Sequence, residues 1–100
     1  MDLRQSLVLM IKQMLQDMEV ILHQGSGYYT CTPFARRYNK LLQQARRLYT
    51  EDNALLGTFE ELPDADPKDP SDKMKVLLGI RIECGQLIAF LESTSEGPAS

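Results

Sequence analysis

The segment from Met74 to Leu91 limits the fold of this 100-residue chain more than any other feature. Read at helical spacing, it is apolar on two nearly opposite faces. The main stripe consists of Met74, Leu77, Ile80, Cys84, Leu87 and Leu91, and the second face consists of Leu78, Ile82, Gly85 and Ala89. A helix that is apolar around most of its circumference must be covered on both sides. Two neighbouring helices of the same chain can cover only one of them.

The second face therefore predicts association between chains. Gly85 and Ala89, four residues apart, would let another backbone approach closely. Leu9, on the polar side of the first predicted helix, also lacks a place inside a three-helix bundle. We expect a homo-oligomer, most simply a two-fold dimer, because this is the commonest closed arrangement. The alternative is a monomer in which the segment 55–62 covers the second face.

A β-hairpin is the alternative to a helix over residues 76–91. Residues 76–82 could form a strand, with Cys84 and Gly85 as a two-residue turn. A glycine inside a helix costs about 1 kcal/mol relative to alanine, and this segment contains Gly79 and Gly85. Residues 86–91 show no alternation, however, and an isolated hairpin is only marginally stable. We therefore expect one helix.

The N-terminal segment also shows helical spacing. It runs from Asp2, a possible cap, to about His23, and Gly25 and Gly27 would end it. Its apolar stripe contains three methionines at four-residue steps, Met10, Met14 and Met18. Methionines can line adaptable binding surfaces, but packing in the core is the favoured interpretation here.

Three shorter signals place the remaining elements. Thr32 as N-cap and Pro33 at the first helical position predict a second helix over 33–49. The apolar residues of 55–62 predict a short helix, for which Thr58 and Glu61 could form a capping box. Asp69-Pro70 repeats the cap-then-proline pattern before the third long helix.

These elements predict an all-α fold. We expect a small antiparallel bundle of three long helices plus one short helix, completed by dimerisation. Residues 1–93 would form a single domain, since 100 residues leave no room for a second core, and 94–100 would be a disordered tail. The longest apolar run, 7–11, is far too short to span a membrane, and the N-terminus lacks the pattern of an export signal. We expect a cytoplasmic protein with reduced cysteines.

Nucleophiles and metal ligands are few. His23 is the only histidine and would lie at a helix end, where a surface role is expected. Cys84 lies on the predicted core stripe, whereas Cys31 would lie in a loop and could be exposed and reactive. A calcium loop starting at Asp64 would need glycine and glutamate where Asp69 and Lys75 stand. We expect no enzyme activity, no catalytic residue, no cofactor and no metal.

The second predicted helix concentrates positive charge, although the chain has a formal net charge of −3. The segment 32–50 has no carboxylate and contains Arg36, Arg37, Lys40, Arg46 and Arg47. This basic face could pair with the acidic segment 51–72 of the same chain or of a second copy. It could instead bind an acidic protein partner or, less favoured because no nucleic-acid-binding motif accompanies it, nucleic acid.

No sequence motif identifies the function of the chain. The favoured hypothesis is a non-enzymatic protein-interaction or assembly module acting as a helical homodimer. The alternative is a nucleic-acid-associated regulator that binds phosphates through the basic helix 33–49.

Overall fold

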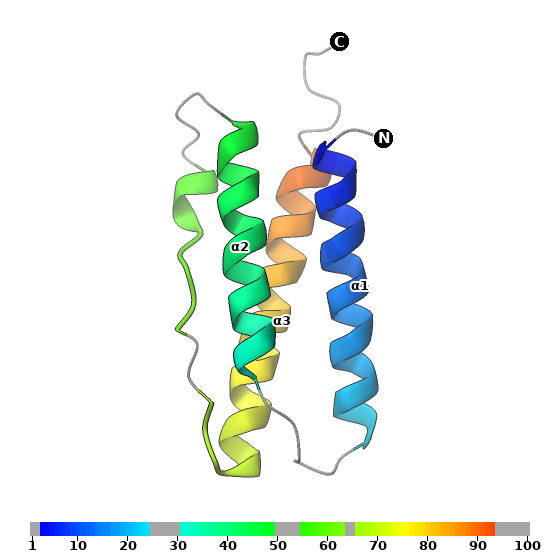
Figure 1. Cartoon of the computed structure of the whole chain (residues 1–100), viewed down its shortest axis with the longest axis vertical. Coiled ribbons are helices and arrows are strands. Elements are labelled where there is room, and N and C mark those ends of the chain that lie inside the picture. Colours follow the sequence, from blue (N-terminus) through cyan, green and yellow to red (C-terminus); the bar gives the residue numbers. More distant parts are fainter. Residues whose placement is uncertain (1–2, 25–30, 50–54, 64–65, 94–100) are drawn as a thin grey trace.

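Three long helices make up most of the protein, whose computed structural model describes residues 3–24, 31–49, 55–63 and 66–93 (Figure 1). The helices are α1 (Leu3–Gln24), α2 (Thr32–Leu48) and α3 (Pro70–Ser93), and a 3-10 turn, η1 (Leu56–Thr58), lies between α2 and α3. The described part contains no strand. The all-α prediction is confirmed, and the hairpin alternative is wrong because Gly79 and Gly85 both lie within α3.

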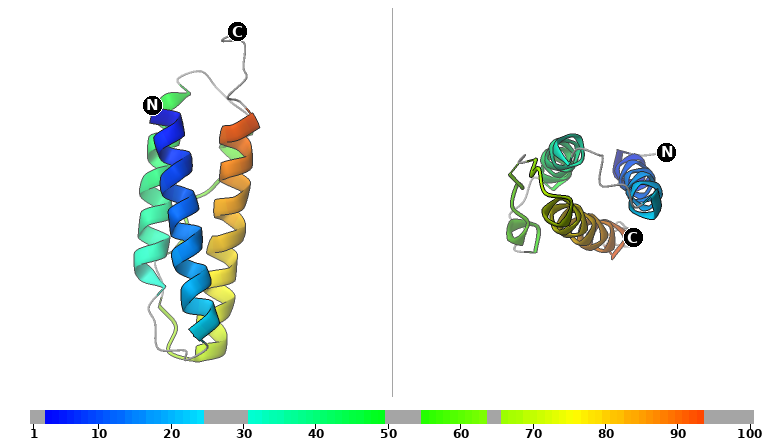
Figure 2. Two further views of the ribbon diagram at one scale, coloured as in Figure 1. Left: turned by 90° about the vertical axis from the view of Figure 1, so that its right-hand side faces the viewer. Right: turned by 90° about the horizontal axis from the view of Figure 1, so that it is seen from below.

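The predicted antiparallel arrangement is only partly correct. Helix α1 runs opposite to the other two, but α2 and α3 run in the same direction (Figures 1 and 2). The thiol of Cys31 at the start of α2 donates to the carbonyl of Lys73 near the start of α3, at 3.4 Å. At the other end, Tyr49 and Phe90 stack edge to face with ring centroids 5.2 Å apart. The connection therefore returns along the bundle before α3 begins.

The two proline-containing helix starts differ. Asp69 accepts the N–H of Ser71 at 2.7 Å, so the predicted cap of α3 is confirmed. Thr32, predicted as the N-cap of α2, is already helical; the cap position is Cys31, with no side-chain cap bond. The carboxylate of Asp66, distant in sequence, accepts the N–H of Cys31 at 3.1 Å. A tertiary contact thus satisfies the backbone at this helix start.

The short helix predicted over 55–62 is a single 3-10 turn, and the Thr58–Glu61 capping box is wrong. The hydroxyl of Thr58 donates to the carbonyl of Leu55 at 2.6 Å. Phe59 is extended, with φ −85° and ψ 132°. The side chain of Asn39 binds both backbone groups of Leu62 at 2.7 Å, which holds the chain extended against α2.

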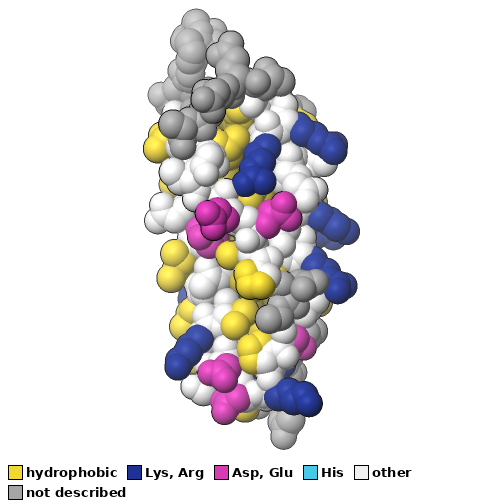
Figure 3. Space-filling view, turned by 90° about the vertical axis from the view of Figure 1, so that its left-hand side faces the viewer, with side chains coloured by type: hydrophobic (Ala, Val, Ile, Leu, Met, Phe, Trp, Pro, Cys, Tyr) yellow, Lys and Arg dark blue, Asp and Glu magenta, His cyan; other side chains and the backbone are white. Residues whose placement is uncertain are grey.

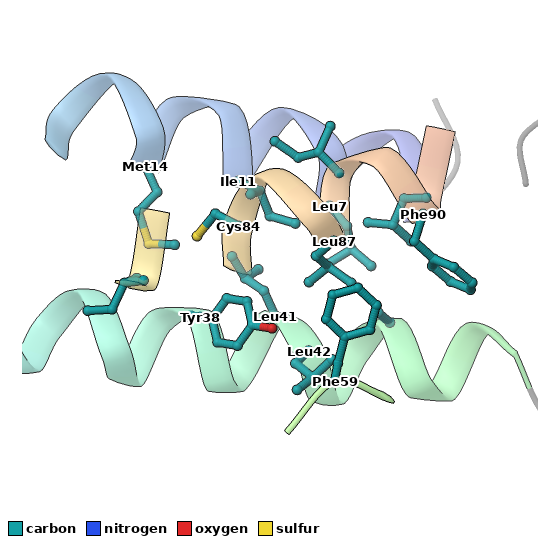
Figure 4. Packing of buried hydrophobic residues seen from close by; sticks show 14 of the residues in the cluster. Leu7, Ile11, Met14, Tyr38, Leu41, Leu42, Phe59, Cys84, Leu87 and Phe90 are labelled. Atoms are coloured by element: carbon teal, nitrogen blue, oxygen red, sulfur yellow. The ribbon is translucent and has the colours of Figure 1, made fainter. Parts of the chain in front are cut away.

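The core combines one apolar stripe from each long helix with η1 and Phe59 (Figure 4). Its fully buried side chains include Ile11, Met18, Tyr38, Leu42, Leu77, Leu87 and Leu91. Seen end-on, the helices stand at the corners of a triangle, and the segment containing η1 lies outside it on the side of α2 and α3 (Figure 2). This segment covers one of the three interhelical faces.

A second interhelical face, between α1 and α3, is crossed by polar contacts. Lys12 Nζ lies 3.1 Å from Glu92 Oε2, and Arg81 forms an ion pair with Glu19. The third face, between α1 and α2, carries the groove described below.

Candidate functional site

The outward face of α3 remains apolar and exposed in the single chain. The predicted dimer face, Leu78, Ile82, Gly85 and Ala89, lies wholly on this side. Ile82 is 65% exposed and Leu78 38%. Met74 was predicted on the core stripe, but this is wrong, because it is 47% exposed on the outward side. It extends the exposed face by one turn, so at about 1.5 Å per residue this face is roughly 22 Å long. We call these five residues the α3 stripe.

The segment 55–63 does not cover the α3 stripe, so the monomeric alternative in which it does so is wrong. Leu56 and Phe59 are buried instead in the core, and the Phe59 ring packs edge to face against Phe90. Ile82 stays among the most exposed large apolar side chains of the described residues. Leu9, which the sequence could not place in a bundle, is likewise about half exposed.

All five residues of the predicted basic face are exposed on α2, namely Arg36, Arg37, Lys40, Arg46 and Arg47. Lys and Arg side chains line one edge of the surface shown in Figure 3. Helical spacing puts Arg36, Lys40 and Arg47 on the side opposite the core. Arg46 lies nearer the segment 55–63 and donates to the carbonyl of Phe59 at 2.6 Å.

In the described part of the acidic segment, the bonds shown to Asn39 and Arg46 of the basic helix come from its backbone. Arg46 and Asn39 of α2 bind main-chain groups of the segment, not carboxylates. The carboxylate of Asp66 pairs with Lys73 Nζ at 2.8 Å. Among the described residues, Lys40 and Arg47 form no salt bridge. Internal charge pairing therefore does not account for these two cations within the part of the chain that is described.

A groove that the sequence did not predict lies between α1 and α2. It has a volume of about 380 Å³ and is lined by Met10, Gln13, Met14, Asp17, Pro33, Phe34 and Arg37. Met14 and Met18 pack in the core as expected, whereas Met10 is 45% exposed. The four-residue methionine spacing was the available signal, but it does not tell which methionine reaches the surface.

The thiols are buried. Cys31, predicted to lie in a loop where it could be exposed, is instead fully buried in the core at the start of α2, where it also contacts Asp66 and Lys73. Burial, and then the Asp66 carboxylate, raises the pKa of the Cys31 thiol. Burial, with a smaller contribution from Glu83, raises the pKa of Cys84 to about 12. Neither environment favours the thiolate that a nucleophile needs.

The other chemistry-bearing groups are arranged as surface or core residues. His23 is exposed near the end of α1, with Nε2 3.4 Å from Glu19 Oε2. No group of three or more His, Cys, Asp or Glu side chains is placed to hold a metal ion among the described residues. Within the same residues, no helix is both long and apolar enough to cross a membrane. The features that stand out are thus the α3 stripe, the basic face and the groove.

Comparison of the chain with protein-family models, with curated proteins and with solved structures finds no match.

Proposed function

We propose that the protein is a non-enzymatic interaction or assembly module that acts as a homodimer through the α3 stripe. The observation that carries the proposal is the exposure of Leu78 and Ile82 on the face of α3 opposite the core. Burying such side chains between two copies removes apolar surface from water, which stabilises the dimer by roughly 25 cal/mol for each Å² of apolar surface buried. The proposal assigns no catalytic residue and no cofactor.

A second copy is the partner that fits this surface most simply. The α3 stripe contains no charged residue, and the small residues Gly85 and Ala89 would let a second backbone approach its C-terminal half closely. A Cβ atom placed on Gly85 would meet no other atom within 4 Å, so the surface is open there. Ile82 lies near the midpoint between Met74 and Ala89. If two copies of α3 cross there about a two-fold axis, Ile82 lies beside its own counterpart.

The mass of the protein in solution tests this proposal. Sedimentation or light scattering over a concentration series should report a dimer for the unchanged chain. Ile82→Glu should give a monomer, because the two introduced charges would face one another across the axis. Val20→Glu is the matched control, since Val20 on α1 is 58% exposed but lies outside the stripe; it should leave the dimer intact. A monomeric unchanged chain at high concentration would contradict the proposal.

The nucleic-acid alternative keeps one specific observation in its favour. Lys40 and Arg47 are exposed on one line of α2 and form no salt bridge within the described part of the chain. Fluorescence polarisation with generic DNA and RNA at two salt concentrations tests it. Binding with a steep salt dependence that Arg36→Glu plus Arg47→Glu abolishes would support this function. No binding at low salt would remove it.

A further inference from the structure

The outward face of α3 has the alternating three- and four-residue spacing by which two helices pair along their length. The positions at this spacing are all exposed, and they are Lys75, Leu78, Ile82, Gly85, Ala89 and Glu92. We call these residues the α3 seam. It shares its four central residues with the α3 stripe and adds one charged residue at each end. The residues of α3 that enter the core lie on the opposite side of the helix.

The size of the side chains changes along the α3 seam. Leu78 and Ile82, in its N-terminal half, are large, whereas Gly85 and Ala89, in its C-terminal half, are small. In a parallel pair each residue would face its own counterpart, so large side chains would crowd at one end and small ones would leave a gap at the other. In an antiparallel pair, Ile82 can face Gly85 of the second copy while Leu78 faces Ala89. Each of these layers then combines a large residue with a small one, which fills the space between the helices.

The charges at the two ends of the α3 seam select the same direction. Parallel helices would place Lys75 beside Lys75 and Glu92 beside Glu92, and such like-charge contacts oppose association. Antiparallel helices in the same register place Lys75 of each copy beside Glu92 of the other. Lys75 forms no salt bridge among the described residues. The Glu92 side chain, 51% exposed, lies 3.1 Å from Lys12, and a carboxylate has the oxygen lone pairs to accept a second cation.

We infer that two copies of α3 pair antiparallel along the α3 seam, with the two-fold axis between Ile82 and Gly85 and a Lys75–Glu92 ion pair at each end. The two Ile82 side chains then lie beside one another in adjacent central layers. This register rests on the proposed function, because it presupposes that α3 pairs with α3 of a second copy. It adds the direction of the pair and the residues that face one another across it.

Engineered cysteines test the direction of the pair. Leu78→Cys and Ala89→Cys are prepared as separate chains of different mass and mixed under mild oxidation. The mixture should form a disulfide-linked dimer containing one chain of each kind. Neither variant should cross-link with itself, because identical positions lie roughly 16 Å apart along the helix axis in this register, too far for a disulfide. The unchanged chain is the control, since Cys31 and Cys84 are fully buried.

A charge reversal tests the contacts at the two ends. Lys75→Glu places two carboxylates side by side at each end of the antiparallel pair, so the dimer Kd measured by sedimentation should rise about tenfold. In a parallel pair the same substitution exchanges one like-charge contact for another and would leave Kd unchanged. Lys40→Glu is the matched control, because it makes the same charge change at an exposed position of α2. It should alter Kd by no more than about twofold.

The outcomes distinguish the register from the homodimer itself. A dimer in which Leu78→Cys and Ala89→Cys each cross-link with themselves overturns the antiparallel register and leaves the homodimer standing. The register is also wrong if Lys75→Glu and Lys40→Glu change Kd equally, or if the mixed cysteine variants do not cross-link in a dimer that Ile82→Glu dissociates. An unchanged chain that sediments as a monomer overturns the homodimer and the register together.

Discussion

Helices α2 and α3 run side by side in the same direction, yet they meet solvent in opposite ways. Helix α2 buries Ala35, Tyr38, Leu41, Leu42 and Ala45 and turns charged and amide side chains outward. Helix α3 buries a similar stripe but exposes Leu78 and Ile82 on its other side. The core thus covers the apolar stripe of α2, but only one of the two apolar stripes of α3. A helix whose periodicity contains two apolar stripes predicts a second neighbour, and among the described residues only the first stripe of α3 is covered.

The largest expected effect separates the two sides of α3. Leu87 is fully buried and Ile82 is 65% exposed, although both are large aliphatic residues on one helix. Leu87→Ala should lower the free energy of unfolding by about 2–5 kcal/mol, because it leaves a cavity in the core. Ile82→Ala should change the stability of the protomer by less than about 0.5 kcal/mol and weaken only self-association. Urea unfolding at low protein concentration measures both; comparable losses would show that the two faces of α3 are not distinct.

The sequence predicted this difference between the helices but not how the chain connects them. Periodicity located the three long helices and the core stripe of α3 except Met74, and it placed Ile82 on the opposite face, since each depends on neighbours one turn away. It did not predict that α2 and α3 are parallel, because this depends on the path of the connection. Cys31 is buried in the core and contacts Asp66 and Lys73, more than thirty residues away, which spacing along the sequence does not reveal. The groove likewise requires α1 and α2 to be placed side by side.

The next-largest effect is expected on α2, at the side chain that binds the segment connecting α2 to α3. Asn39 donates to the Leu62 carbonyl and accepts the Leu62 N–H, both at 2.7 Å. Asn39→Ala should cost about 1–3 kcal/mol, because two partly buried backbone groups lose their partner. Lys40→Ala, the exposed neighbour, should be nearly neutral. Hydrogen exchange should show faster exchange of the Leu62 amide in the first variant alone. Equal stability of the two variants would mean that the connection does not depend on this contact.

A smaller effect, confined to alkaline pH, arises from the buried side of α3. The pKa of Cys84 rises from its ordinary value of 9.0 to about 12 in the folded chain. Above pH 9 the unfolded thiol releases its proton while the folded thiol keeps it, so stability must fall as pH rises from 9 towards 12. This group can contribute at most about 1.4 kcal/mol per pH unit. Between pH 8 and pH 10.5, the free energy of unfolding should fall less steeply with pH for Cys84→Ala than for the unchanged chain. Parallel curves would contradict the raised pKa of Cys84.

The smallest effect concerns the one polar atom that α2 buries without a partner. The hydroxyl of Tyr38 lies inside the core (Figure 4) and has no hydrogen-bond partner among the described residues. Tyr38→Phe keeps the ring and removes the orphan hydroxyl, so it should leave stability unchanged or raise it by up to about 1 kcal/mol. Tyr38→Leu also removes the hydroxyl but loses ring packing, and should destabilise the protein. A clear loss of stability in Tyr38→Phe would mean that this hydroxyl is hydrogen-bonded in solution and that the inner face of α2 is less purely apolar than that of α3.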